Sequence, residues 1–161
     1  MFSSITKVVS IGTIASEVTF SDIIEKVPNI EVFKTENKSL KVNGETWLKD
    51  LMKFKKGKNF QELCIHLDTI EFDIELLKEF ILTKCINDVS IEINYQSSIP
   101  KTVINSFVDK IGKIFFEEQR PSFRREPHIK IYNGRYNRYF ILDNEKPAPT
   151  RATRKRKLDF E

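Results

Sequence analysis

Cys64 and His66 are the residues of this chain whose types and spacing could form a nucleophile and its base. They lie two positions apart in a run that alternates with apolar residues, so on a strand they share one face with Cβ atoms about 7 Å apart. Catalysis would also need a third group to orient the imidazole, and the sequence offers no obvious one. We therefore predict that both residues belong to a sheet surface.

Three carboxylates, Asp68, Glu71 and Asp73, follow the same run. Acidic residues between a strand and a helix more often cap the helix than catalyse a reaction. The sequence contains no glycine-rich phosphate loop, no Gly-x-Ser-x-Gly motif and no His-Glu-x-x-His motif. Two cysteines and two histidines show no zinc-ligand spacing. We predict a non-enzymatic protein without a metal or cofactor.

The elements that position these residues follow from apolar periodicity, which alternates between strand and helix periods from residue 20 to residue 116. Strands are predicted at residues 30–34, 40–42, 63–67 and 89–93. Helices are predicted from a cap at Ser21 to Pro28, over residues 47–54, after a cap at Asp73, and from Pro100 to Ile114. Each later strand reaches the next through a helix, which predicts a parallel sheet.

The spacing of these units suggests a repeat. Val42 and Ile65 are 23 residues apart, and Ile65 and Ile91 are 26 apart. This period falls in the range of leucine-rich repeats, although their strict leucine and asparagine positions are missing. The alternative is an ordinary three-layer α/β domain with irregular spacing.

The chain changes character after Phe116. Residues 117–127 are polar and predict a loop. Asn133-Gly134 between alternating runs predicts a β-hairpin with a type I′ turn. We predict an α/β fold, a degenerate leucine-rich-repeat-like solenoid of strand-helix units with a parallel sheet, closed by a C-terminal hairpin. The domain would span residues 1–145, and residues 146–161 would form a disordered basic tail.

Charge divides the chain in the same way. The sequence has 27 Lys and Arg against 23 Asp and Glu, a net charge of +4 over 161 residues. Residues 146–161 contain six basic and two acidic residues and therefore hold the whole excess. The remaining body is neutral, so nucleic-acid binding by the folded body is not expected.

No apolar run approaches the roughly 18 residues of a membrane span. The stretch from Val8 to Ala15 is too short and interrupted for a signal peptide. We expect an intracellular, cytoplasmic protein whose thiols are reduced. Import into the nucleus is a further hypothesis.

The predicted sheet face opposite the apolar residues is our candidate partner-binding site, because solenoids commonly bind partners on their exposed sheet. Its alternative is a face that is simply solvated. The residues expected there are Cys64, His66, Ser90, Glu92, His128, Lys130 and Tyr132.

The tail supports two readings. Arg154, Lys155, Arg156 and Lys157 form a basic cluster that an importin or a polyanion would accept. Arg156 to Phe160 also fits a basic-x-Leu-x-Phe pattern that resembles cyclin docking peptides, with Leu158 and Phe160 as the apolar anchors. The alternative is a solvated terminus.

Four segments resemble the type 2 F-box-associated domain of nematode F-box proteins. They are FSDIIEKVPNIEVF at residues 20–33, Trp47 within ETWLKDL, DTIEFDIELL at residues 68–77, and INSFV at residues 104–108 followed by Ile111. The match would cover about residues 8–116. The family's F-box would precede this region, and the chain leaves no room for it before Phe20.

The resemblance implies a leucine-rich-repeat-like module that selects substrates for a cullin-RING ubiquitin ligase and carries no catalytic residues. Our leading hypothesis is thus a protein-interaction module whose partner is a ligase substrate. The alternative is a small nuclear regulator that acts through its basic tail on nucleic acid or a cyclin-type protein.

Overall fold

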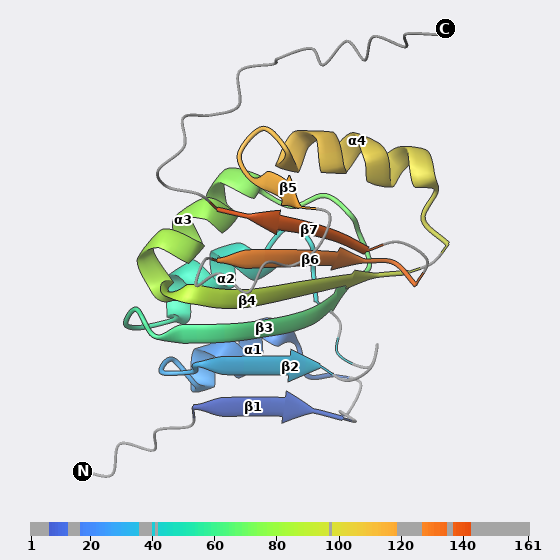
Figure 1. Cartoon of the computed structure of the whole chain (residues 1–161). Coiled ribbons are helices and arrows are strands. Elements are labelled where there is room, and N and C mark those ends of the chain that lie inside the picture. Colours follow the sequence, from blue (N-terminus) through green and yellow to red (C-terminus); the bar gives the residue numbers. More distant parts are fainter. Residues whose placement is uncertain are drawn as a thin grey trace, which may run out of the picture.

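The computed structural model describes residues 7–12, 17–35, 40, 42–96, 98–118, 127–134 and 137–142, and these residues form an α/β fold (Figure 1). They contain four helices and one open, mixed sheet of seven strands in the order β1-β2-β3-β4-β6-β7-β5. The strands are β1 (Val8–Ile11), β2 (Val32–Thr35), β3 (Phe60–Leu67), β4 (Cys85–Tyr95), β5 (Phe116–Glu118), β6 (His128–Tyr132) and β7 (Asn137–Ile141). The helices are α1 (Phe20–Lys26), α2 (Trp47–Phe54), α3 (Ile74–Lys84) and α4 (Lys101–Ile111).

Most of the sheet is parallel. Strands β1, β2, β3, β4 and β6 pair with one another in parallel, and β7 runs antiparallel to both β6 and β5. Helices α1, α2 and α3 each connect one parallel strand to the next. The predicted parallel sheet with crossover helices is confirmed.

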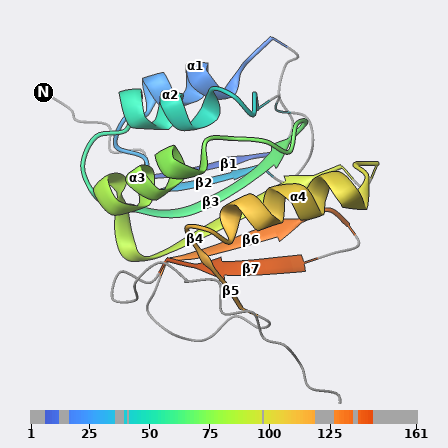
Figure 2. The ribbon, with the colours of Figure 1, turned by 90° about the horizontal axis from the view of Figure 1, so that it is seen from above.

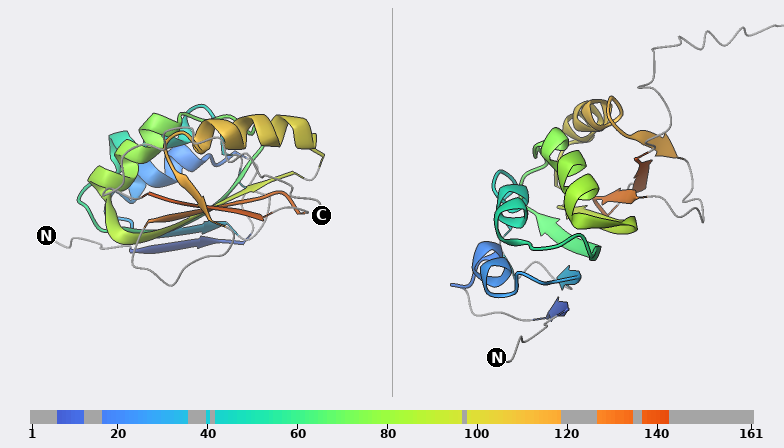
Figure 3. Two further views of the ribbon diagram at one scale, coloured as in Figure 1. Left: turned by 45° about the horizontal axis from the view of Figure 1, so that its top comes forward. Right: turned by 90° about the vertical axis from the view of Figure 1, so that its left-hand side faces the viewer.

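The helices all cover the same face of the sheet (Figures 2 and 3). The predicted alternative of a three-layer domain is therefore wrong, because the described residues form one helical layer and one sheet. Between the layers lies a core of apolar side chains, in which Phe60 of β3 meets Phe80 of α3 edge to face at 5.4 Å between ring centroids. Phe72 joins Trp47 of α2 to Phe107 of α4 in the same way.

Local side-chain bonds decide where the helices begin. Asp73 caps α3 as predicted, since its Oδ1 accepts a hydrogen bond from the Leu76 amide at 2.9 Å. The cap predicted at Ser21 is wrong by two residues. Thr19 caps α1 in a capping box with Asp22, in which each side chain accepts a hydrogen bond from the other residue's backbone amide.

Of the strand predicted at residues 40–42, Leu40 and Val42 are described; neither belongs to a strand of the sheet, and Val42 makes an isolated bridge with Leu67. The neighbour of β3 is β2, and Phe33 pairs with Leu63, 30 positions later. Leu63 pairs with Ile91 after 28 positions, and Ile91 with Ile129 after 38. The predicted steps of 23 and 26 residues are therefore wrong. The first was counted from Val42, whose alternation imitates a strand, and the second joined Ile65 to Ile91, whereas Ile65 pairs with Ile93.

The structure adds a strand at each edge of the sheet. β1 comes from the apolar stretch that begins at Val8, and β5 includes the first residues of the predicted loop at 117–127. Glu117 of β5 forms an ion pair with Arg138 of β7. Neither strand is long enough to show a clear alternation in the sequence.

The predicted hairpin is present, because β6 and β7 pair from His128 with Ile141 to Tyr132 with Asn137. Its predicted type I′ turn is wrong. Four residues separate the last pair, and of Asn133 and Gly134 only the glycine has a positive φ, +82°. The hairpin also does not end the sheet, since β5 lies beyond β7. The predicted boundary at residue 145 and the tail lie outside the described residues.

Candidate interaction face

The predicted site residues share the sheet face that the helices leave uncovered. The strands place Leu63, Ile91 and Ile129 side by side under the helices, each at most 1% exposed. Because successive side chains alternate between faces, the next residue of each strand points the other way. All seven predicted residues are half-buried there.

Strand register arranges this open face in three rows. The first contains Glu62, Ser90 and His128, the second Lys34, Cys64, Glu92, Lys130 and Tyr139, and the third His66, Asn94 and Tyr132. We call these residues the open face. Parallel pairing brings the predicted set together from three strands, with adjacent strands about 4.8 Å apart.

Charges on the open face are paired. Glu92 on β4 accepts an ion-paired contact from Lys130 on β6, with 3.1 Å between Oε2 and Nζ. Lys34 on β2 lies 2.8 Å from Glu62 on β3, and this hydrogen bond raises the pKa of the lysine. The open face therefore carries positive and negative charges at defined positions, and the net charge of these four side chains is zero.

Cys64 lies in the middle of the second row. Burial, followed by the negative charge of Glu92, raises the pKa of its thiol. The Asn94 side-chain amide donates to its sulfur at 3.6 Å. A thiol with a raised pKa is a poor nucleophile at neutral pH, because the thiolate is the reactive form.

His66 contacts a residue other than Cys64. Its Nδ1 lies 3.3 Å from the hydroxyl oxygen of Thr35. The same Thr35 hydroxyl donates a hydrogen bond to the carbonyl oxygen of Cys64 at 3.3 Å. The arrangement holds the imidazole beside β2. It supports the prediction of a surface histidine over that of a catalytic base.

The remaining predicted residues occupy the β4 and β6 side of the face. Ser90 pairs with His128 in the first row, and Tyr132 lies opposite Asn94 in the third. Lys130 lies over the Tyr132 ring, with Nζ 5.4 Å from the ring centroid. An amphipathic aromatic next to a cation is a common feature of protein interfaces.

A cavity adjoins the open face at the ends of β3 and β4. It has a volume of about 330 Å³ and is lined by Leu40, Val42, His66, Leu67, Asp68, Asn94, Tyr95 and Gln96. Tyr95, one of the lining residues, is held in place by a hydrogen bond of 2.8 Å from its hydroxyl to the Ile70 carbonyl. The apolar walls and the polar His66 and Asn94 would suit a single inserted side chain.

Four members of the open face were missed by the sequence reasoning: Lys34, Glu62, Asn94 and Tyr139. Alternation within the predicted strand at residues 30–34 would have placed Lys34 on the sheet face opposite to that of Phe33. The other three lie just outside the predicted strand ends or in the predicted hairpin arm. Only the register shows which of them meet.

The tail residues, metal ligands and membrane spans considered in the sequence analysis are not part of the open face. The predicted import or docking residues, Arg154 to Phe160, lie outside the described residues. In the part of the chain that is described, no three His, Cys, Asp or Glu side chains gather as metal ligands. None of the helices there has the length and apolar character to cross a membrane.

Comparisons with protein-family models, with curated proteins and with solved structures found no match to this chain.

Proposed function

We propose that this protein is a non-enzymatic interaction module and that its open face binds a protein partner. The observation that carries the proposal is the one-sided helical layer, which leaves a broad sheet surface with half-buried polar side chains in register. The four charged side chains of this face are paired with one another, Lys34 with Glu62 and Glu92 with Lys130, so the pattern of charge that a partner would meet has a defined arrangement.

We further propose that the strand-helix units are degenerate leucine-rich-repeat-like units. One strand and one helix in each unit, with parallel strands and a single helical layer, support this reading. The unequal steps between paired strands mark the degeneracy. On the basis of the resemblance to the F-box-associated domain, the proposed partner is a substrate of a cullin-RING ubiquitin ligase.

The cavity next to His66 offers the partner an anchoring point. Interfaces gain most of their affinity from a few side chains that fill desolvated pockets. The paired charges of Glu92 and Lys130 lie one row away and would select the orientation of the partner, because like charges placed opposite them are strongly disfavoured.

A charge-swap experiment tests the proposal. The double variant Glu92→Lys with Lys130→Glu keeps the intramolecular ion pair and so should keep the fold, while it inverts the pattern that a partner meets. The tagged wild type and variant are used to capture proteins from the native host cells, and the captured proteins are quantified by mass spectrometry. We expect a specific set to fall at least fivefold with the variant.

The matched control is the double swap Glu75→Lys with Lys78→Glu on α3, which changes the same number and sign of charges in the helical layer. Capture should be unchanged with this control. The open-face proposal would be contradicted if both swaps lost the same proteins, or if neither swap changed the captured set. Ligase adaptor and cullin subunits among the lost proteins would support the F-box reading.

A further inference from the structure

The cavity at the ends of β3 and β4 contains a buried hydrogen-bond acceptor that no described residue uses. Asn94 lines this cavity and is 6% exposed. Its side-chain amide donates to the Cys64 sulfur at 3.6 Å and to the Ile65 carbonyl at 3.4 Å. Its Oδ1 accepts no hydrogen bond from the part of the chain that the structure describes. Because buried carbonyl oxygens nearly always have a partner, this Oδ1 indicates a ligand that donates a hydrogen bond inside the cavity.

Asp68 gives the cavity a carboxylate. It is the one Asp, Glu, Lys or Arg among the described lining residues, and it forms no ion pair with another described residue. Asp68 and Val42 also line a neighbouring cavity of about 410 Å³, where Asp50 adds a second carboxylate. No described lining residue of either cavity is a lysine or an arginine. The two cavities therefore favour a cationic group.

An anionic occupant is disfavoured, although two helices begin nearby. Phe20 and Thr46, at the starts of α1 and α2, line the neighbouring cavity. The amides of a helix N-terminus attract anions, but the first turns of these helices already contain Asp22 and Asp50. Asp22 accepts a hydrogen bond from the Thr19 amide at 3.0 Å. These carboxylates would repel a further anion at the same amides.

The apolar part of the wall suits an aliphatic stem. Leu40, Val42 and Leu67 line the cavity and are each 2% exposed. Long basic side chains pack their methylene groups on apolar surface while the charged end reaches a polar partner. A volume of about 330 Å³ lies at the small end of ligand pockets, which measure roughly 300–1,000 Å³. The cavity thus has room for one such side chain.

Arginine fits these features better than lysine. Its guanidinium has five donors in a fixed plane, so it can donate to Asp68 and to Asn94 at the same time. It is also less strongly hydrated than an ammonium and loses less on leaving water. Arginine is among the residues that most often dominate the affinity of protein interfaces.

We propose that this cavity binds an arginine side chain of the partner protein, with the guanidinium paired to Asp68 and hydrogen-bonded to Asn94 Oδ1. The inference rests on the proposed function, because a partner on the open face would present the arginine. The two surfaces are continuous, since His66 and Asn94 pair in the third row of the open face and both line the cavity. The cavity then selects the residue type that anchors the partner.

Titration of the isotope-labelled full chain with the tripeptide acetyl-Gly-Arg-Gly-amide, followed by NMR, tests this. Saturable shifts are expected at the backbone amides of Leu67, Asp68, Asn94 and Tyr95 with millimolar peptide. The same peptide with citrulline keeps the shape of arginine without its charge and should bind roughly tenfold more weakly, because charge-assisted hydrogen bonds are lost. The lysine peptide should also bind more weakly than the arginine peptide.

Two variants place the peptide in the cavity. Asp68→Asn should weaken arginine binding about threefold, since Asp68 is exposed and its ion pair is screened by water. Asn94→Leu removes the buried acceptor and should weaken binding about tenfold. Asp109→Asn on α4 removes the same charge from an exposed position outside both cavities and is the matched control, which should bind as the wild type does.

Equal affinity for the arginine and citrulline peptides would overturn the proposal, as would equal affinity of the wild type and both variants. Shifts confined to other residues, or no shift with millimolar peptide, would overturn it as well. Unchanged amide signals of the core residue Leu63 in the variants would show that the fold is kept. The assay contains no partner protein, so its failure removes the arginine site alone, whereas unchanged capture in the charge swap removes the open-face proposal alone.

Discussion

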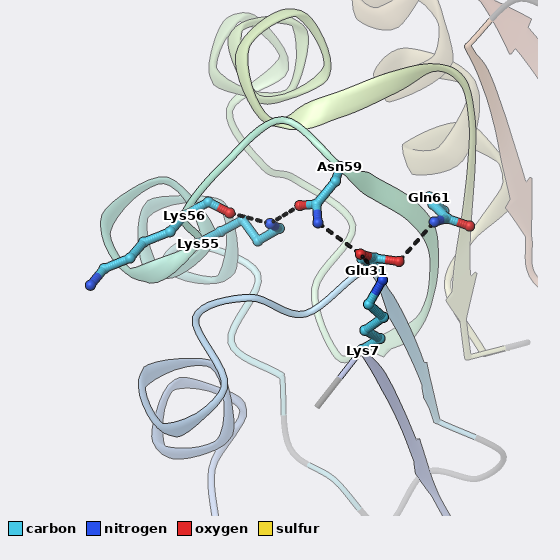
Figure 4. Close-up of polar contacts among 6 residues, drawn as sticks. All are labelled: Lys7, Glu31, Lys55, Lys56, Asn59 and Gln61. Carbon is cyan, nitrogen blue, oxygen red and sulfur yellow. Dashed lines mark hydrogen bonds and ion pairs between the residues drawn. The ribbon is translucent and has the colours of Figure 1, made fainter. Parts of the chain in front are cut away.

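Lys55 donates a hydrogen bond to Asn59 across the turn that follows α2, with 2.6 Å between Nζ and Oδ1; Lys55 is 1% exposed and Asn59 is half-buried (Figure 4). Burial lowers the pKa of Lys55. A buried ammonium is tolerated only when its donors are matched, and the same Asn59 amide links it to Glu31. The contact thereby ties the loop after α2 to the start of β2.

Asn59→Ala should therefore destabilise the protein by about 1–3 kcal/mol, because it leaves a buried charged donor without this acceptor. Urea unfolding at pH 7 measures the change. In a Lys55→Met background the ammonium is absent, and the same substitution should cost less, because it then removes only the Asn59 hydrogen bond to Glu31. An equal cost in both backgrounds would show that Asn59 acts independently of Lys55.

Cys85 makes stability depend on pH in the alkaline range. Burial raises the pKa of its thiol to about 12 from 9.0. Since the unfolded chain loses this proton from about pH 9 and the folded chain keeps it, the stability present below pH 9 falls as the pH rises toward 12. One pH unit within this window is worth about 1.4 kcal/mol.

Comparison with Cys85→Ala isolates this contribution from those of tyrosines and lysines. Between pH 9 and pH 10, the free energy of unfolding of the wild type should fall by up to about 1.4 kcal/mol more than that of the variant. Parallel curves for the two proteins would contradict the assignment.

Gly44 is required by a close approach of two loops. A Cβ atom there would lie 2.0 Å from Thr69 Oγ1 and 3.3 Å from the Glu71 carbonyl oxygen. Gly44→Ala should cost roughly 1–2 kcal/mol in thermal or urea unfolding, and Thr69→Ala in the same chain should recover most of it. If the second substitution recovers nothing, the contact with Thr69 is not the cause.

Cys64 should react slowly as a nucleophile. Its raised pKa leaves less thiolate at neutral pH than free cysteine has. Iodoacetamide at pH 7.5, followed by mass spectrometry, should modify Cys64 more slowly than free glutathione and leave the fully buried Cys85 unmodified. Faster alkylation of Cys64 than of glutathione would reopen the catalytic interpretation of Cys64 and His66.

Periodicity was sufficient to predict the parallel pairing of the central strands, the positions of all four helices and the hairpin. Strong patterns such as Leu63, Ile65 and Leu67 leave one face apolar and one polar whatever the neighbouring strand is. The pairing partners could not be predicted in the same way. Val42 alternates like a strand residue, yet the strand next to β3 is β2, and only tertiary packing distinguishes them.

Seven of the eleven residues of the open face were predictable from the sequence, and the contacts between them were not. Alternation alone put Cys64 and His66 on one side, together with Glu92 and Lys130. Which side chains meet depends on strand register, and therefore the pairs Lys34 with Glu62 and His66 with Thr35 appeared only in the structure.

Site-specific photocrosslinking tests the central claim most directly. A benzoylphenylalanine residue is placed at Lys130 on the open face or, as a matched control, at Lys78 in the helical layer, and the protein is irradiated in the native host cells. The open-face account predicts a discrete crosslinked partner from position 130 and none from position 78. Crosslinks only from position 78, or equal products from both positions, would contradict it.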